Sequence, residues 1–204
     1  MGIHNKINDE QIRKSNEKFN KEFIKSLNLS FNIDHFEGKL DKGKCKDSTV
    51  YQLVWLKNID RLINLIPKEI NIENYNLCDV GCGLCISTIY FQKNYVFKSF
   101  SGFDYNQELI FTSKKIINEL DLNNKISVEI DNAVNIKLKS KPYILFLFNP
   151  FGSQTLNLFL NNNLENLKSN KSIILYANDL WKDSINGFKK VYRDDFYNLS
   201  TILF

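Results

Sequence analysis

The sequence predicts an α/β domain with a mainly parallel sheet, preceded by a helical extension. From about residue 75 onward, short apolar runs alternate with segments of helical periodicity, as in βαβ units. The run at 143–150 is apolar almost throughout, which is typical of a strand buried on both faces. Two glycines, Gly81 and Gly83, follow the first run at the point where a strand would pass into a helix.

The elements before the sheet are a polar helix over residues 8–27 and a glycine-punctuated loop over 34–49. A second helix is expected from Tyr51 to Pro67, because apolar residues recur there with helical spacing and a proline follows. The chain therefore divides into an N-terminal helical extension, residues 1–48, and a main domain, residues 49–204.

Strands and helices alternate through the main domain, and each helix is long enough to cross from one strand to the next. The expected strands are 75–81, 97–105, 125–133, 143–150 and 171–179. The expected helices are 85–95, 106–122 with Asn106 as N-cap, and 155–168. The tail, residues 188–204, has two strand-like runs that are able to form a closing hairpin.

The composition is that of a soluble globular protein, with 43% hydrophobic and 25% charged residues. No apolar run is long enough to span a membrane, and the N-terminus lacks the apolar core of a signal peptide, so a cytoplasmic protein is expected. The net charge of +4 permits an anionic partner without requiring one.

Four cysteines raise the question of a metal site, because Cys82 and Cys85 have the spacing of zinc ligands. No second cysteine pair follows, and both histidines, His4 and His35, lie far upstream. No metal is therefore predicted, and the cysteines, Cys45 and Cys78 included, are interpreted as small buried residues.

Polar groups follow three successive predicted strands, where open α/β sheets bind their ligands. Asp79 precedes the glycine turn, and Asp104 lies 21 residues after Gly83, a spacing suited to hydrogen bonds with ribose hydroxyls. Asp131 and Asn132 end the third strand, where a carboxylate and an amide are able to face an adenine edge. Together these residues predict a site for a nucleoside cofactor.

The segment Asp79-x-Gly81-x-Gly83-x-Cys85 resembles motif I of the class I S-adenosylmethionine-dependent methyltransferases, D/E-x-G-x-G-x-G, with a cysteine for the last glycine. The segments 102–106 and 130–133 are similar to the following motifs of that family, so the resemblance covers about residues 50–204. It implies a Rossmann-like seven-stranded sheet ordered 3-2-1-4-5-7-6, with strand seven antiparallel and helices on both faces. It also implies a cofactor, S-adenosyl-L-methionine, bound by Asp79, Val80, Gly81, Cys82, Gly83, Asp104, Tyr105, Asp131, Asn132, Ala133 and Asn149.

The segment Asn149-Pro150-Phe151-Gly152 resembles the N-P-P-F/Y motif of methyltransferases that act on amino nitrogens, one proline short. It also resembles N-P-F-G segments of small bacterial methyltransferase-like proteins. The first resemblance implies a catalytic set of Asn149, Pro150 and Phe151: the asparagine side chain and a following backbone carbonyl hold the target amino group, with the ring beside it. N-methylation is therefore favoured, although Asn-Pro is also a common turn.

The acceptor stays open among a protein lysine, a nucleic acid and a small molecule, and residues 1–48 are expected to act as a substrate lid. Ser48, Thr49 and Tyr51 are interpreted as a helix cap and a core aromatic rather than as cofactor ligands. The alternatives are an O-methyltransferase of a small molecule or sugar, for which Asp179 is the candidate base, and a catalytically silent scaffold. A nucleotide-binding oxidoreductase is a further alternative, but the missing third glycine and Asp79 disfavour it.

Overall fold

The computed structural model of the protein describes residues 3–36, 38 and 47–204, with side chains from residue 9 on. The α-helices are α1 Ile3–Ser26, α2 Leu56–Asn64, α3 Ile86–Asn94, α4 Gln107–Glu119 and α5 Ser153–Ser169. The strands are β1 Asn76–Val80, β2 Ser99–Asp104, β3 Ile126–Ile130, β4 Tyr143–Phe148, β5 Ile173–Ala177, β6 Lys190–Asp194 and β7 Leu199–Leu203. Four short 3-10 helices are η1 Asp34–Phe36, η2 Ile72–Asn74, η3 Ala133–Asn135 and η4 Lys182–Ser184.

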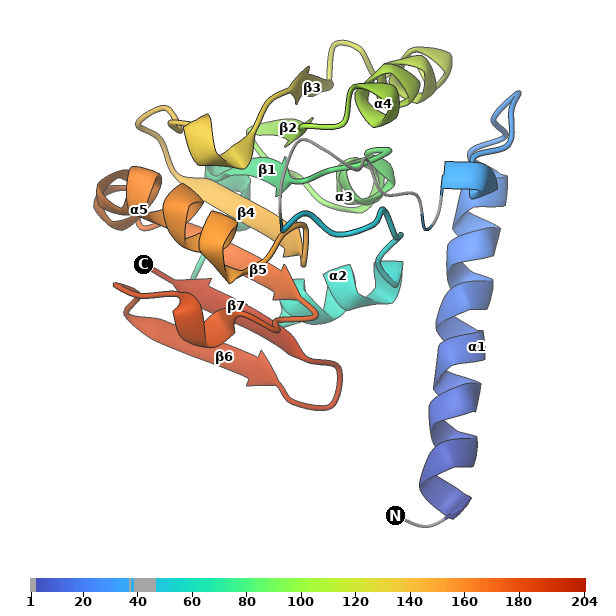
Figure 1. The fold of residues 1–204 in the computed structure, drawn as a ribbon, viewed down its shortest axis with the longest axis horizontal. Coiled ribbons are helices and arrows are strands. Elements are labelled where there is room, and N and C mark those ends of the chain that lie inside the picture. The colour runs from blue at the N-terminus through green and yellow to red at the C-terminus, as the bar shows by residue number, and fades with distance from the viewer. Residues whose placement is uncertain (1–2, 37, 39–46) are drawn as a thin grey trace.

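The strands form one seven-stranded sheet in the order β3-β2-β1-β4-β5-β7-β6 (Figure 1). Strands β1 to β5 are parallel, and β7 runs antiparallel to both β5 and β6. This order, including the antiparallel β7 and the hairpin of the tail, confirms the predicted fold. The order reverses between β1 and β4, which leaves a crevice at their carboxyl ends.

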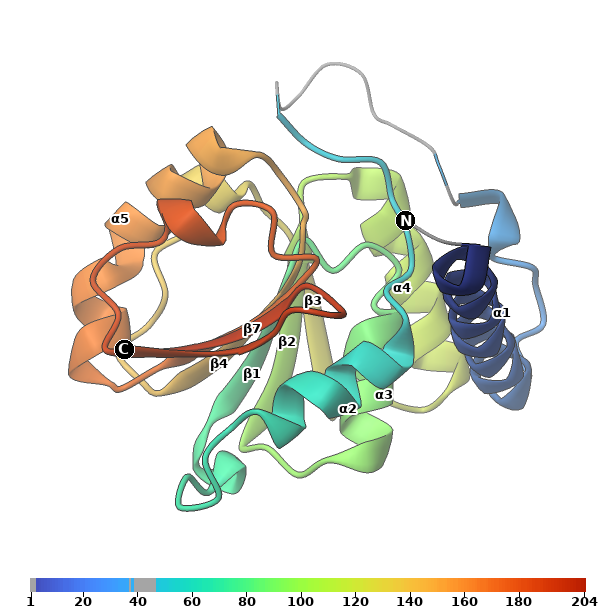
Figure 2. The ribbon, with the colours of Figure 1, turned by 90° about the horizontal axis from the view of Figure 1, so that it is seen from below.

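Helices cover both faces of the sheet, as predicted. Helix α5 lies on one face, and α2, α3 and α4 lie on the other (Figure 2). Along β4 the side chains alternate between the two cores: Ile144 and Phe146 pack toward α2 and α3, whereas Leu145 and Leu147 pack toward α5. This alternation explains why the strand is apolar at every position.

The helix predicted from Tyr51 begins only at Leu56, because residues 51–55 have no regular secondary structure. The buried side chain of Asn20, on α1, sets this boundary. Its amide nitrogen donates to the carbonyl of Val54 at 2.8 Å, and its oxygen accepts from the N–H of Leu56 at 2.9 Å. A side chain far away in sequence thus caps the helix, and it overrides the local helical spacing.

Helix α1 confirms the predicted helical extension and runs beside the face that carries α2 and α3 (Figures 1 and 2). Phe19 and Phe23 approach the ring of Tyr90 edge to face, with centroids 6.2 and 5.1 Å away, and the ammonium of Lys57 lies 5.0 Å from the Phe19 ring. The contacts fasten the helix to α2 and α3. Within the described part of the chain, no helix combines the length and apolar character that crossing a bilayer requires.

Candidate functional site

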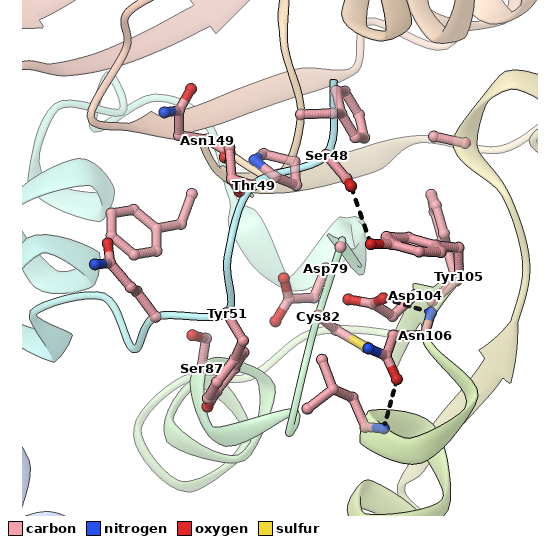
Figure 3. A pocket seen from close by; sticks show the side chains of 18 of the residues that line it. Ser48, Thr49, Tyr51, Asp79, Cys82, Ser87, Asp104, Tyr105, Asn106 and Asn149 are labelled. Atoms are coloured by element: carbon pink, nitrogen blue, oxygen red, sulfur yellow. Dashed lines mark hydrogen bonds between the residues drawn. The ribbon is translucent and has the colours of Figure 1, made fainter. Parts of the chain in front are cut away.

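A cavity of about 310 Å³ opens at the carboxyl ends of β1, β2 and β4, where the strand order reverses (Figure 3). The predicted site residues that line it are Asp79, Gly81, Cys82, Asp104, Tyr105, Asp131, Asn132, Ala133, Asn149, Pro150 and Phe151. Val80 and Gly83 are not among the lining residues: Val80 is fully buried within the sheet, and Gly83 lies against the ring of Tyr51. The topology therefore brings together groups from four strand ends.

Asp104 ends β2 and holds the glycine turn in place. Its Oδ2 accepts a hydrogen bond from the backbone N–H of Gly83 at 3.0 Å, and its Oδ1 accepts one from the N–H of Asn106 at 2.8 Å. Burial raises the pKa of this carboxyl above its ordinary value, although the backbone hydrogen bonds oppose that shift. The same carboxylate therefore orders the loop and faces the cavity.

Asp79 is the more deeply buried carboxyl of the cavity and is only 3% exposed. Burial raises its pKa to about 7, helped by the nearby charge of Asp104 and opposed by a 2.8 Å hydrogen bond from the Thr88 hydroxyl. A positively charged ligand group beside Asp79 would favour the ionised form. The electrostatics of this end of the cavity therefore suit a cation.

We expect the shifted pKa of Asp79 to make folding stability depend on pH. Because the folded-state pKa, about 7, lies above the ordinary 3.8, the stability contribution is full below pH 3.8 and is lost as the pH rises toward 7. Asp79→Asn, which keeps an acceptor for Thr88, removes this loss. Relative to the variant, wild type should lose about 2 kcal/mol between pH 5 and pH 7 in urea unfolding. If the difference in unfolding free energy between wild type and the variant stays constant from pH 5 to pH 7, the pKa of Asp79 is not raised.

The glycine turn is packed against two side chains. Gly83 has φ +52°, and a Cβ there would lie 2.3 Å from the Tyr51 ring; Gly81 has φ +73°, and a Cβ there would lie 2.4 Å from the Cβ of Pro150. Tyr51 and Pro150 therefore fill the space beside the two glycines. Cys85, at the place of the third motif glycine, also adopts a left-handed conformation, φ 63°, which glycine would adopt without steric cost.

The cysteines in the described residues are buried and free, and their packing agrees with the interpretation as small core residues. The side chain of Cys82 lies against Gly102 of β2, where a Cβ would come within 2.8 Å of it. Cys45, like most of the loop predicted over 34–49, lies outside the described residues. Among the side chains that are described, no group of three or more His, Cys, Asp or Glu is arranged to hold a metal ion.

A strap formed by residues 47–52 crosses the cavity and bonds to the segment after β4. The backbone N–H of Thr49 donates to the carbonyl of Pro150 at 3.3 Å, and its hydroxyl donates to the carbonyl of Asn149 at 2.8 Å. The hydroxyl of Tyr105 donates to the Ser48 hydroxyl at 3.0 Å (Figure 3). Ser48, Thr49 and Tyr51 therefore line the cavity. Ser48 and Thr49 do not cap a helix as interpreted, because α2 begins only at Leu56, whereas Tyr51 does pack against the core.

The beginning of the strap is anchored by Asp47. The carbonyl of Asp47 accepts from the N–H of Gly152 at 2.8 Å, and its carboxylate accepts from the N–H and the hydroxyl of Thr155 at 3.0 and 2.5 Å. These bonds cap the first turn of α5 with a negative charge. In the sequence, the strap can be recognised only by its position just upstream of the helix that precedes motif I.

Asn149 directly follows β4 and adopts a left-handed conformation, φ 45°. Its amide points away from Asp79 and Asp104 (Figure 3), and its Oδ1 lies 3.4 Å from the hydroxyl of Tyr176. The carbonyl of Pro150, the second acceptor implied by the resemblance, holds the N–H of Thr49. Both acceptors thus have partners within the chain.

Asp179, the candidate base for O-methylation, is outside the residues that line this cavity. Its carboxylate forms a bidentate ion pair with Arg193, with N–O distances of 2.9 and 3.1 Å, and accepts a hydrogen bond from Ser200. Burial alone would raise its pKa, but the hydrogen bonds from Arg193 and Ser200 outweigh burial and lower it. Asp179 therefore has a structural role that ties β5 to the hairpin of β6 and β7.

No protein-family model matches the sequence, and no curated protein matches it significantly. Solved structures are similar in fold. A protein of the NADB-Rossmann superfamily from Streptococcus agalactiae is 15% identical with a TM-score of 0.51, and the match covers 75% of this chain and 68% of that one. The StiE O-MT is 13% identical with a TM-score of 0.43, covering 58% of this chain and 43% of that one. The ribosomal protein L11 methylase from Lactobacillus delbrueckii subsp. bulgaricus is 11% identical with a TM-score of 0.48, and the match covers 72% of this chain and 77% of that one.

At an identity of 15%, the similarity to the Streptococcus agalactiae protein shows the fold alone. It is Rossmann-like, in agreement with the strand order.

Proposed function

We propose that the chain is an S-adenosylmethionine-dependent methyltransferase. One observation carries the proposal: carboxylates from three neighbouring strand ends, Asp79, Asp104 and Asp131, line one cavity at the reversal point of a sheet ordered 3-2-1-4-5-7-6. Ligands of open α/β sheets bind at that point. A cavity of about 310 Å³ falls within the range of small-molecule sites.

The chemistry of the lining fits this cofactor. Asp104 would accept hydrogen bonds from two ribose hydroxyls, and Asp131 with Asn132 would face the adenine. Asp79, whose pKa is raised to about 7, suits the ammonium of the amino-acid part. Tyr51 and Pro150 line the cavity and pack against the glycine turn.

The residues of this chain contribute positioning rather than acid–base chemistry. When bound, S-adenosylmethionine supplies an electrophilic methyl group on a sulfonium, so that the acceptor forms a bond to carbon as the carbon–sulfur bond breaks. A neutral amine needs no base before transfer, and its surplus proton leaves to water afterwards. Among the described residues the lining holds no histidine, Asp179 is committed to Arg193, and the lining carboxylates Asp79, Asp104 and Asp131 are assigned to the cofactor, which together favours an amine acceptor over a hydroxyl. Catalysis would then come mostly from proximity and orientation.

The alternative of a dinucleotide oxidoreductase finds less support. Dinucleotide folds order their parallel strands 3-2-1-4-5-6, whereas this sheet inserts an antiparallel β7 between β5 and β6. The third glycine of the dinucleotide motif is also missing, since Ile86 stands in its place. A catalytically silent scaffold would have the same fold, so the fold does not distinguish it from an enzyme, and a binding measurement is needed.

Calorimetric titration of the full chain with S-adenosylhomocysteine, and with NADH as comparator, tests the proposal. Saturable binding of S-adenosylhomocysteine alone is expected, because the cavity offers carboxylates for one ribose and one ammonium. Binding of NADH alone would replace the proposal by redox chemistry. Binding of neither ligand would favour the scaffold.

A further inference from the structure

The strap of residues 47–52 is held to the body of the protein along one short contact. Ser48 and Phe151 form an antiparallel bridge outside the main sheet, and a backbone hydrogen bond flanks it on each side, at 3.3 and 2.8 Å. The outer side of the strap faces solvent, since Thr49 and Val50 are exposed. Strand pairing this short, with an exposed backbone, has a low local stability.

Asp47 supplies the charged tie between the strap and the body. Its carboxylate accepts hydrogen bonds from the N–H and the hydroxyl of Thr155, at 3.0 and 2.5 Å, in the first turn of α5. Charge-assisted hydrogen bonds and the helix dipole both stabilise a carboxylate at this place. Asp47 itself is not among the described residues that line the candidate cofactor site, so it acts on that site through the strap.

Gly152 gives Asp47 the room to reach α5. A Cβ on Gly152 would lie 3.0 Å from Oδ2 of Asp47 and 3.1 Å from its Cβ, which is tighter than ordinary contacts. The backbone at Gly152 has φ −75°, which all residue types adopt, so its conformation does not require glycine. The small size of this residue therefore serves the close approach of the strap.

The two ends of the strap differ in how firmly they are packed. At one end, the ring of Tyr51 fills the space beside Gly83 and packs against the core. Residues 47–50, at the other end, carry a single apolar side chain, that of Val50, which is 36% exposed. These four residues are therefore able to lift from the cavity while Tyr51 stays in place.

Residues 48–50 line the candidate cofactor site together with Asp79 and Asp104 (Figure 3). We propose that residues 47–50 form a gate of this site, and that Asp47 is the positioning residue that keeps the gate closed. The inference rests on the proposed function. The ligand would enter and leave while the gate is open, and the closed gate would retain it.

Such a gate has a kinetic signature. Because Asp47 does not line the cavity, weakening its bonds to Thr155 raises the open population of the gate by the same factor with and without a bound ligand. Entry and exit then become faster together, and the dissociation constant, which is the ratio of the two rate constants, stays nearly the same. Damage to the cavity itself would instead weaken binding.

Stopped-flow binding of S-adenosylhomocysteine to the full chain tests the inference. For Asp47→Ala we expect association and dissociation rate constants that are both about 10-fold higher than in wild type, with a dissociation constant within about 2-fold. Gly152→Ala, which displaces the strap from the opposite side of the contact, should give the same pattern with rates about 5-fold higher.

A matched control removes a side-chain cap elsewhere in the chain. Asn71 caps η2 by accepting a hydrogen bond from the N–H of Glu73 at 3.0 Å, and it is not among the described residues that line the cavity. Asn71→Ala should therefore lower stability, as loss of a cap does, but leave both rate constants unchanged.

Hydrogen exchange measures the same gate without a ligand. The N–H groups of Thr49 and Gly152 both donate across the contact between the strap and the segment after β4. In Asp47→Ala they should lose about 10-fold in protection, whereas the N–H groups within β4 should keep theirs.

Two kinetic outcomes overturn the inference: unchanged rate constants in Asp47→Ala and Gly152→Ala, or faster dissociation with unchanged association, which would mean that Asp47 shapes the cavity instead. If S-adenosylhomocysteine does not bind to wild type, the proposed function fails, and hydrogen exchange decides on the gate alone. Loss of protection confined to the strap and its contact then supports the gate, and unchanged protection refutes it.

Discussion

Replacing Asp104 by alanine is expected to weaken S-adenosylhomocysteine binding by about 100-fold or more, because two charge-assisted hydrogen bonds to the ribose would be lost. Each such bond contributes about 1.5–3 kcal/mol. Asp104 also accepts hydrogen bonds from the N–H groups of Gly83 and Asn106, at 3.0 and 2.8 Å. The substitution would therefore also loosen the glycine turn that forms one wall of the cavity. Calorimetric titration measures the loss.

Two companion variants separate binding from folding. Asp104→Asn keeps the shape of the side chain but removes the charge and one acceptor, so its loss should be intermediate. Glu129→Gln, on an exposed position of β3, removes a carboxylate away from the cavity and should bind like wild type. Far-ultraviolet circular dichroism of each variant checks that the sheet is intact. Unchanged affinity in folded Asp104→Ala would refute the ribose assignment.

Gly83→Ala is expected to lower the free energy of unfolding by about 2–5 kcal/mol. Alanine at φ +52° carries a backbone cost of about 1–2 kcal/mol. The added methyl group would also stand 2.3 Å from the ring of Tyr51, and displacing a packed ring costs about 1–3 kcal/mol. Urea unfolding of the variant and wild type measures the sum.

The chain offers a control that isolates the two contributions. Gly38 has φ +77°, and among the described residues no atom lies within 4 Å of the position that a Cβ would take, so Gly38→Ala should show the backbone cost alone. Combining Gly83→Ala with Tyr51→Ala removes the clash but not the backbone cost. A double-mutant cycle should therefore give a favourable coupling of about 1–3 kcal/mol. If the changes in unfolding free energy caused by the two substitutions are additive, Tyr51 does not fill the space above Gly83.

Most of the sheet could be predicted from the sequence, because its signals are local. The apolar run that became β4 is buried on both faces, and Asn106 caps α4 with its side chain as expected, accepting hydrogen bonds from the N–H groups of Glu108 and Leu109. The strand order came from the family resemblance, since several orders satisfy the same alternation of strands and helices. The polar residues that follow the predicted strands make up much of the cavity lining.

The misses share a physical cause, which is contact between segments far apart in sequence. The start of α2 depends on Asn20, 36 residues before Leu56, and no local pattern encodes that bond. The strap over the cavity depends on contacts of Asp47 and Thr49 with the segment after β4, about 100 residues away. The backbone carbonyl of Asn149 takes part in the same contacts, since it accepts the hydrogen bond from the Thr49 hydroxyl. Motif spacing identifies which residues meet, but not which hydrogen bonds they already satisfy.

The amide of Asn20 has a consequence for how the molecule comes apart. It satisfies the carbonyl of Val54 and the N–H of Leu56 at once, and it is 8% exposed. If α1 were to detach, both backbone groups would lose their partner, at about 1–3 kcal/mol for each group that stays buried. The aromatic contacts with Tyr90 would be lost in the same step. We therefore expect the part of α1 around Asn20 to unfold in the same cooperative step as the sheet rather than to fray on its own.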